Sequence, residues 1–326
     1  TLAIEGGQII ALDPKTGEIL AMANYPSFNP NEYWKEKDPS IFINGACQKL
    51  FEPGSIFKPI TLAAAMNEGK ITPQTTYIDE GFVKIGSHTI YNYDFKVFGK
   101  QNMTNVLEFS INTGAVFAQS QIPHSVFENY IQKFGIFEKT GIDLPEVYSE
   151  NKEFKKGYEI NYATASFGQG IEMTPLHIIR ALSALANGGK ILSPYVVKEI
   201  ITEKEVIEIK PKIVRENVVS KETALQITGM LTSAVENGYG KRAKIPGYYI
   251  AGKTGTSQIP FSSLGLNKKG YSEKTWQSFL GWIPAFDPKV IFLVKLDNPK
   301  AQMAGVSTTQ IAKEFLQYII NYYQIP

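Results

Sequence analysis

The sequence is poor in the residues that most often build disulfides, metal sites and histidine-dependent catalytic sites. Among 326 residues there are one cysteine and three histidines. A single Cys47 excludes an intramolecular disulfide and predicts a small buried side chain. His88, His124 and His177 are not clustered with metal-ligating residues, and none follows a nucleophile-elbow sequence. We therefore expect no metal or other cofactor and no Ser–His–Asp triad.

Charge of one sign and long apolar runs are also lacking. Lys and Arg number 33 against 31 Asp and Glu, and the densest basic cluster, 152–156, is interrupted by Glu153. Nucleic-acid binders usually carry a basic stripe, so we expect no nucleic-acid partner. No run approaches the roughly 18 apolar residues of a transmembrane-helix candidate. Neither common type of glycine-rich phosphate loop is present.

The distribution of elements predicts an α/β (α+β) fold with two lobes. Hydrophobic residues make up 43% and charged residues 20%, as in ordinary globular domains. Strand-like runs lie at both ends of the chain, at 8–13, 18–24, 248–259, 276–283 and 290–296. Helical patterns fill the middle, with a capping box at 125–128, N-caps at Thr174 and Ser220, and a closing amphipathic helix at 308–322. We expect a central antiparallel sheet from both chain ends, flanked by helices, with an inserted, mostly helical lobe.

Ser55 and Lys58 are a candidate for a nucleophile activated without histidine. A helix is predicted to begin near Ser55, and residues three apart share one helix face. Lys58 could then accept the proton of the Ser55 hydroxyl, provided that burial or a neighbouring cation keeps the amine neutral. The Ser-x-x-Lys pattern alone is weak, because Ser149 and Lys152 also match it.

Order and context select one set among several matches. A Ser-x-x-Lys nucleophile followed by Ser-x-Asn and then by Lys-Thr-Gly on a strand is a known catalytic arrangement. Lys-Thr-Gly begins at Lys15, Lys139 and Lys253, but only Lys253 lies in a strand-like run. Ser-x-Asn occurs at 27–29, 110–112 and 149–151. The set that keeps the order consists of Ser55 and Lys58, Ser110 and Asn112, and Lys253, Thr254 and Gly255.

With these motifs the chain resembles the class B penicillin-binding proteins, the monofunctional peptidoglycan D,D-transpeptidases. The resemblance rests on four segments in the family's order: the opening hairpin at 7–18, the nucleophile segment Phe-Glu-Pro-Gly-Ser-Ile-Phe-Lys-Pro at 51–59, Phe-Gly-Gln-Gly at 167–170 with Thr-Pro-Leu at 174–176, and Ile-Ala-Gly-Lys-Thr-Gly-Thr-Ser-Gln at 250–258. The middle motif reads Ser-Ile-Asn where many relatives have Ser-Ser-Asn. The Phe-Gly-Gln-Gly segment is more similar to the division (septal) branch than to the elongation branch. The resemblance implies the fold shared by these transpeptidases and the serine β-lactamases.

The resemblance also implies a role for each matched residue. Ser55 would be the acylated nucleophile and Lys58 its base. Ser110 would relay a proton and Asn112 would bind the peptide backbone. Lys253 would supply positive potential. The strand motif would hold the terminal carboxylate through Thr254 and Thr256, and Gly255 would let a substrate backbone approach. The backbone N–H groups of Ser55 and Thr256 would form the oxyanion hole.

The same family implies partners and surroundings. We expect peptidoglycan stem peptides and β-lactams as ligands, with a membrane glycosyltransferase of the division or elongation machinery as a protein partner. Residues 7–326 would form the transpeptidase domain, with a sheet lobe at about 7–50 and 190–326 and a helical lobe at about 55–189. Residues 1–6 would be a remnant or junction. The expected location is extracytoplasmic, with a family-type amino-terminal membrane anchor and pedestal domain missing from this chain.

Three alternatives share the motif order. A serine β-lactamase needs a base that activates a deacylating water. The spacing of Glu146 and Asn151 does not match the Glu-x-x-x-Asn pattern of the class A enzymes, and the interval from Ser110 to Lys253 is long for a compact lactamase. A D,D-carboxypeptidase would use the same nucleophile. A penicillin-sensing receptor domain would be acylated without turnover.

Overall fold

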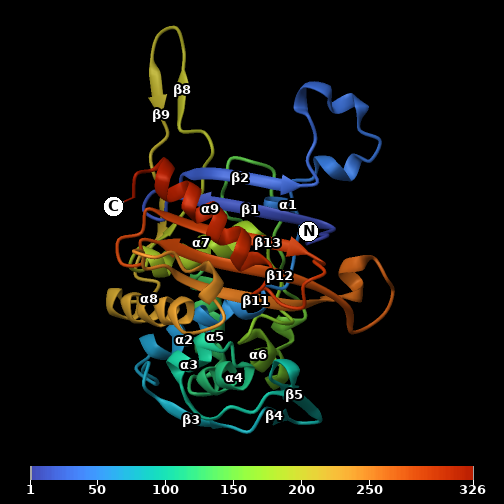
Figure 1. Ribbon diagram of the computed structural model, residues 1–326, viewed down its shortest axis with the longest axis vertical. Coiled ribbons are helices and arrows are strands. Elements are labelled where there is room, and N and C mark those ends of the chain that lie inside the picture. Colours follow the sequence, from blue (N-terminus) through green and yellow to red (C-terminus); the bar gives the residue numbers. More distant parts are fainter. Residues whose placement is uncertain (1, 326) are drawn as a thin grey trace.

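The computed structural model describes residues 2–325 and contains a five-stranded antiparallel sheet. The strand order is β11-β12-β13-β1-β2. The bounds are β1 (Gly6–Leu12), β2 (Ile19–Tyr25), β11 (Ala251–Pro260), β12 (Tyr271–Ile283) and β13 (Val290–Asp297). Because β1 pairs with both β2 and β13, the two ends of the chain meet in one sheet, as predicted (Figure 1). The predicted antiparallel pairing of β12 with β13 is also confirmed.

Helices cover both faces of this sheet. Helix α9 (Thr308–Tyr322), which begins and ends at the predicted residues, contacts β12 and β13 on one face. Helices α7 (Pro175–Ala186) and α8 (Lys221–Glu236) contact the sheet as well, α7 through β1 and β13 and α8 through β11. Side chains of β13 alternate between two apolar clusters, Ile291 and Leu293 in one and Phe292 and Val294 in the other. Burial on both faces explains why β13 is a continuous apolar run.

The remaining helices lie mainly in a second lobe below the sheet (Figure 1). They are α2 (Lys58–Asn67), α3 (Met103–Glu108), α4 (Asn112–Ser120), α5 (His124–Lys133) and α6 (Glu159–Ala165), whereas the short α1 (Gly45–Gln48) contacts β1, β2 and α7. Short strands accompany them: β3 (Thr76–Asp79), β4 (Phe82–Ile85), β5 (His88–Tyr91) and β6 (Gly99–Asn102). Four more lie between α7 and α8: β7 (Ile191–Leu192), β8 (Glu199–Ile201), β9 (Val206–Glu208) and β10 (Ile213–Arg215). The β8–β9 hairpin projects from the top of the molecule in Figure 1.

Several sequence expectations fail or need adjustment. The capping box at Ser125 is wrong, because α5 begins at His124 after Pro123 and has no side-chain cap. The strands between residues 76 and 102 were not predicted, and α7, assigned to the helical lobe, contacts β1 and β13. By contrast, Thr174 and Ser220 cap α7 and α8 as expected, each accepting a backbone N–H three residues on.

Helix α2 joins the two lobes and positions the nucleophile segment. Its residues from Lys58 to Met66 are all buried, and a helix that is apolar nearly all round must be enclosed by neighbours. Pro59 lies in the first turn, where a missing N–H costs nothing. A short 3-10 helix, Gly54–Phe57, precedes α2 and contacts β11. Ser55 and Lys58 are therefore fixed between the core helix and the edge strand of the sheet.

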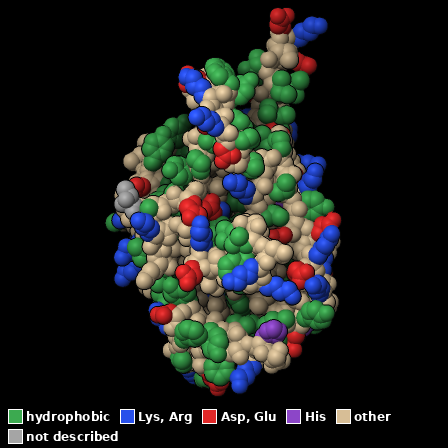
Figure 2. Space-filling view, turned by 90° about the vertical axis from the view of Figure 1, so that its right-hand side faces the viewer, with side chains coloured by type: hydrophobic (Ala, Val, Ile, Leu, Met, Phe, Trp, Pro, Cys, Tyr) green, Lys and Arg blue, Asp and Glu red, His purple; other side chains and the backbone are tan. Residues whose placement is uncertain are grey.

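Charges of both signs are mixed on the surface, whereas Cys47 and His177 lie inside the protein. Figure 2 shows Lys and Arg interspersed with Asp and Glu on the visible face, with no large area of one sign. Among residues 2–325, no helix combines the length and apolarity that crossing a bilayer requires. Cys47 is fully buried, as predicted. His177 is buried too, with Nδ1 bonded to Thr174 Oγ1 and Nε2 to the Glu138 carbonyl.

Candidate active site

The Lys58 amine lies at the centre of a hydrogen-bond cluster between the lobes. Its Nζ atom is 2.9 Å from Ser55 Oγ, 2.6 Å from the Ser110 carbonyl oxygen and 2.8 Å from Asn112 Oδ1. The last two atoms can only accept hydrogen bonds. A neutral amine has two N–H bonds and one lone pair, so donation to these two acceptors leaves the lone pair for the Ser55 hydroxyl. This geometry suits proton transfer from Ser55 to Lys58.

The orientation of Asn112 is determined by its other contacts. Its Nδ2 group donates to the carbonyl oxygen of Tyr91 at 3.0 Å, so that Oδ1 faces Lys58. Ser110 precedes α4 in the left-handed region with a φ of 58°, a conformation that costs free energy in a non-glycine residue. In this conformation the Ser110 carbonyl oxygen contacts Lys58 and the Ser110 hydroxyl contacts Lys253.

Lys253 approaches the same site from β11. Its Nζ donates to Ser110 Oγ at 2.8 Å and to the Thr254 carbonyl at 3.0 Å. Ser110 Oγ is also 3.4 Å from Lys58 Nζ, so this hydroxyl lies between the two amines. Neither lysine forms an ion pair with a carboxylate within residues 2–325. The structure thus brings together Ser55, Lys58, Ser110, Asn112 and Lys253, whose roles stay predictions.

Burial lowers the pKa of both lysine amines, and at Lys58 the charge of Lys253 adds to this effect. Lys58 is fully buried, and this burial, followed by the charge of Lys253, holds the pKa of Lys58 well below its ordinary value. Burial lowers the pKa of Lys253 to about 7. Ser55 itself lies near the N-terminus of α2, where unpaired N–H groups and the helix dipole favour negative charge. The surroundings therefore favour a neutral Lys58 beside a hydroxyl that must lose its proton.

The third motif lies on an edge strand. β11 pairs only with β12 in the five-stranded sheet, so one side of its backbone is free to pair with an extended peptide. Thr256 Oγ1 accepts the N–H of Ala304 at 3.1 Å, which leaves the hydroxyl proton available for a carboxylate. The Thr254 side chain is mostly buried. The proposed oxyanion hole of the Ser55 and Thr256 N–H groups stays a prediction.

Close packing around β11 also requires a glycine at position 255. A Cβ atom at this position would lie 2.6 Å from Ser278 Oγ and 3.0 Å from Ile56 Cγ2. The missing side chain therefore lets β11 pack against the nucleophile segment, and the approach of a substrate backbone to Gly255 stays a prediction. Any contact of Gly255 with a peptide would go through its backbone.

The Phe-Gly-Gln-Gly segment, residues 167–170, contacts the backbone of the residue that precedes Ser55. Gly54 N donates to the Gly168 carbonyl at 3.0 Å. A Cβ atom on Gly168 would lie 2.2 Å from the Gly54 carbonyl oxygen, and its φ of 80° is in the left-handed region. Gly54 also has a positive φ, of 59°. The two glycines allow these backbone segments to touch directly beside Ser55.

The competing motif matches lie elsewhere in different chemical surroundings. Ser149 Oγ donates to Glu172 Oε1 at 2.7 Å, while Lys152 is exposed and paired with Glu150. Lys15 lies in the hairpin turn and forms an ion pair with Asp287. Lys139 belongs to no helix or strand. Ser149 and Lys152, the second Ser-x-x-Lys match, therefore do not form a hydrogen-bonded pair of hydroxyl and amine.

We expect Ser149→Ala to leave covalent labelling by a fluorescent penicillin unchanged. The mutation removes a hydroxyl that bonds the Glu172 carboxylate, while Lys152 is exposed and paired with Glu150. Labelling followed by gel fluorescence measures the outcome. A variant that folds but no longer labels would show that the wrong serine has been identified as nucleophile.

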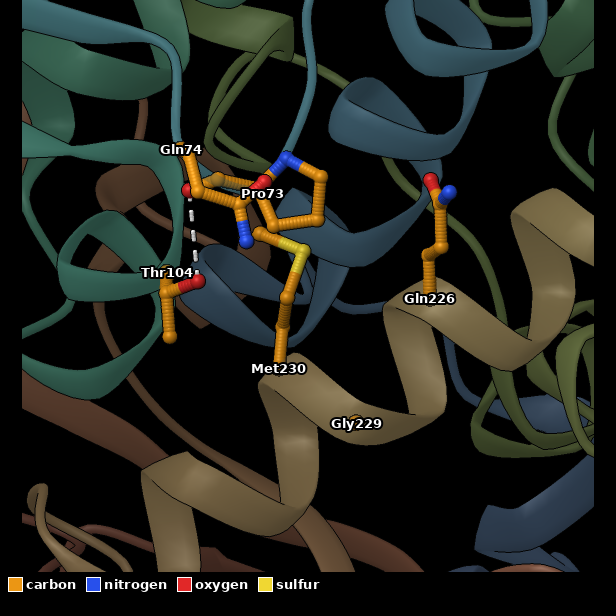
Figure 3. A pocket seen from close by; sticks show the side chains of 6 residues that line it. All are labelled: Pro73, Gln74, Thr104, Gln226, Gly229 and Met230. Carbon is orange, nitrogen blue, oxygen red and sulfur yellow. Dashed lines mark hydrogen bonds between the residues drawn. The ribbon is translucent and has the colours of Figure 1, made fainter.

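A hollow of about 250 Å³ lies away from this cluster (Figure 3). It is lined by Pro73, Gln74, Thr104, Gln226, Gly229 and Met230. Three of these come from α8, and Thr104 Oγ1 donates to the Pro73 carbonyl. None belongs to the hydrogen-bonded cluster around Lys58, so we do not assign the substrate to it.

Two further residues of the site region gave no signal in the sequence. Asp79 and Asn92 are buried and bonded to the start of α4. They belong to no recognisable motif and lie far from Asn112 along the chain, so only the fold brings them to the site.

Comparisons with known proteins agree on one family. Residues 7–317 match the penicillin binding protein transpeptidase domain. Stage V sporulation protein D of Bacillus subtilis is 35% identical over 96% of this chain and 49% of its own length. A peptidoglycan D,D-transpeptidase FtsI homolog of Mesostigma viride is 33% identical over 98% of this chain and 57% of its own length. This chain therefore spans about half the length of these curated relatives.

A solved structure shows the same fold. Penicillin binding protein 3 of Mycobacterium tuberculosis, complexed with aztreonam, superimposes with a TM-score of 0.89 at 27% identity, covering 100% of this chain and 74% of that one. The expected transpeptidase fold, with its antiparallel sheet and inserted helical lobe, is confirmed. The chain belongs to the penicillin-binding protein transpeptidase domain family, among relatives of the class B type.

Proposed function

We propose that this chain cross-links peptidoglycan stem peptides as a serine D,D-transpeptidase. The observation that carries this proposal is the position of Lys58 Nζ, 2.9 Å from Ser55 Oγ and bonded to two atoms that can only accept, the Ser110 carbonyl oxygen and Asn112 Oδ1. In a neutral Lys58 these two bonds use both N–H groups and leave the lone pair for Ser55. Ser55 Oγ attacks the carbonyl of the penultimate D-Ala, and Lys58 takes the hydroxyl proton. A proton passes by way of Ser110 to the leaving D-Ala nitrogen. An amine of a second stem peptide then resolves the acyl-enzyme.

The other motif residues bind the donor in this proposal. Lys253, Thr254 and Thr256 hold its terminal carboxylate, and Asn112 bonds its backbone. Gly255 takes part through its backbone alone. The N–H groups of Ser55 and Thr256 stabilise the oxyanion, for about 3 kcal/mol per donor. A β-lactam follows the same path to a stable acyl-enzyme.

The location and partners belong to the same proposal. Stem peptides lie outside the cytoplasmic membrane, and we place the reaction there. Attachment through an amino-terminal membrane helix and a partnership with a membrane glycosyltransferase of the division or elongation machinery are further parts of the proposal. They are motivated by the family and by a relative named as an FtsI homolog.

Timed release of a β-lactam adduct separates the candidate functions. A long-lived adduct together with cross-linking of a stem-peptide pair supports the transpeptidase. Rapid turnover would indicate a lactamase, whose deacylating base is not evident, since no carboxylate pairs with either lysine within residues 2–325. Release of D-Ala without transfer to an amine would indicate a carboxypeptidase. A stable adduct without any peptide reaction would indicate a receptor.

The second-order rate of acylation is expected to follow a bell-shaped pH curve. Lys58 must be neutral to act as base, and its pKa is depressed by burial and then by Lys253, so the rate rises as pH increases through that pKa. Lys253 must be charged to attract a carboxylate, and burial lowers its pKa to about 7. The rate should therefore fall as pH rises above about 7. Penicillin labelling at a series of pH values measures the curve.

A matched variant tests the assignment of the alkaline limb. Arginine remains protonated throughout the accessible range, so Lys253→Arg should move the alkaline limb to higher pH. An unchanged alkaline limb in this variant would remove Lys253 from the explanation. A wild-type rate that keeps rising well above neutral pH would contradict it as well.

A further inference from the structure

A buried carboxylate without a cationic partner among the described residues, Asp79, lies beside the Ser110–Asn112 motif and bonds to Thr113. Asp79, at the end of β3, is 2% exposed. It accepts hydrogen bonds from Thr113 Oγ1 at 2.6 Å, Phe98 N at 2.7 Å, Asn92 Nδ2 at 2.9 Å and Gly81 N at 3.1 Å. It forms no ion pair within the described part of the chain. A charge that is buried in this way requires such a complete set of donors.

Asn92 connects this carboxylate to helix α4. Because its Nδ2 group donates to Asp79, its Oδ1 atom points the opposite way. That oxygen accepts the backbone N–H groups of Asn112 at 3.0 Å and Thr113 at 3.1 Å. These are the first two residues of α4, where N–H groups have no acceptor within the helix. The α4 N-cap residue is Ile111, whose side chain cannot accept, so Asn92 provides the missing cap from another segment.

The same segment also holds the side chain of Asn112. The Tyr91 carbonyl accepts from Asn112 Nδ2 at 3.0 Å, and Asn92 directly follows Tyr91 in the chain. The backbone N–H of Asn112 is therefore bonded to Asn92, and its side-chain amide is bonded to the Tyr91 carbonyl. With Nδ2 bonded to the Tyr91 carbonyl, Asn112 Oδ1 faces Lys58. Ser110, with its left-handed backbone, comes two residues earlier, and such a conformation persists only when its surroundings hold it.

We propose that Asn92, oriented by Asp79, is a positioning residue for the reaction. Neither residue bonds Ser55 or Lys58. They fix the start of α4. Asn112 in its first turn and Ser110 just before it provide the two acceptors that leave the lone pair of a neutral Lys58 for the nucleophile. This inference rests on the proposed function of the Ser55 site. It adds two residues that the motifs of the family resemblance do not include.

The kinetic test compares Asn92 variants with a helix-cap control. Asn92→Ala removes the cap, and Asn92→Asp keeps an acceptor but sets a carboxylate against Asp79. Each should lower the acylation rate at saturating fluorescent penicillin by about ten- to a hundredfold, the effect of a small misplacement of catalytic groups. Ser220→Ala removes the cap of α8 and should lower Tm without lowering that rate. Assays run well below the Tm of every variant.

Exchanging the two side chains provides the rescue. In the double variant Asp79→Asn with Asn92→Asp, the amide again faces the carboxylate, and the carboxylate can still accept the two α4 N–H groups. The acylation rate should recover part of the loss seen in Asn92→Asp, because the amide introduced by Asp79→Asn has only one oxygen to accept the Thr113, Phe98 and Gly81 donors. The proposal is overturned if Asn92→Ala acylates at the wild-type saturating rate, or if its loss is no larger than that of Ser220→Ala.

Amide hydrogen exchange separates this inference from the proposed function. In Asn92→Ala, the N–H groups of Asn112 and Thr113 should exchange faster, while the amides of α8 keep their protection. If wild-type protein is not acylated at all, the proposed function fails, yet the exchange result still decides whether Asn92 caps α4. Unchanged exchange at both amides would overturn the cap.

Discussion

Ser55→Ala is expected to abolish covalent labelling by a fluorescent penicillin. The acyl bond forms at Oγ, and alanine has no atom there to attack the carbonyl. The remaining groups of the site stay in place, because Lys58 keeps its bonds to the Ser110 carbonyl and to Asn112 Oδ1. Serine and alanine differ by one atom, so Tm should change little. Gel fluorescence and intact-protein mass measure the loss directly.

Ser110 is the one residue that could complicate this result. Its hydroxyl is the second one near Lys58, at 3.4 Å from Nζ, and it accepts from Lys253 at 2.8 Å. Residual labelling of Ser55→Ala would be mapped by peptide mass, and Ser110→Ala added to it would remove a signal that came from Ser110. Full labelling of a folded Ser55→Ala protein would refute the assignment of the nucleophile. Ser149→Ala, with an equal change in volume, serves as the control.

The sequence could identify the motifs because each one is local. Ser55 and Lys58 share one helical turn, and Lys253 lies in a run of strand-forming residues, so spacing and order excluded the matches at Lys15 and Ser149. The structure gives independent reasons for excluding them, since Lys15 pairs with Asp287 and Ser149 bonds to Glu172. Likewise, β13 and α9 were predictable because their apolar patterns are long and regular.

What the sequence could not predict depends on contacts between distant segments. Asn92 bonds Asn112 across 20 residues, and Asp79 bonds Thr113 across 34, without any periodic pattern. The four-residue strand β6 reads Gly-Lys-Gln-Asn, which carries no apolar alternation. The packing that requires a glycine at position 255 could not be predicted for a similar reason. The residues that a Cβ would touch, Ser278 and Ile56, come from another strand and from the nucleophile segment.

Lys58→Ala is expected to slow acylation by about 10²- to 10⁴-fold, the usual contribution of a general base. The proton of Ser55 would then have to pass to water or through Ser110. Truncation also leaves the half-buried Ser110 carbonyl and Asn112 Oδ1 without their donor, at a cost of up to about 1–3 kcal/mol for each. A fall in Tm should therefore accompany the loss of rate. Stopped labelling reactions at saturating penicillin measure the rate, and thermal unfolding measures the stability.

Lys58→Gln separates the loss of the base from the loss of packing. Its amide can donate to either acceptor and fills much of the same space, but it cannot take a proton near neutral pH. We expect Lys58→Gln to keep more of the wild-type Tm than Lys58→Ala while acylating just as slowly. Both variants should also lose the acidic limb of the pH curve, because that limb reports the protonation of Lys58. A Lys58→Gln protein that acylates near the wild-type rate would mean that the proton of Ser55 leaves by another route, with the buried amine serving only to hold Ser110 and Asn112 in place.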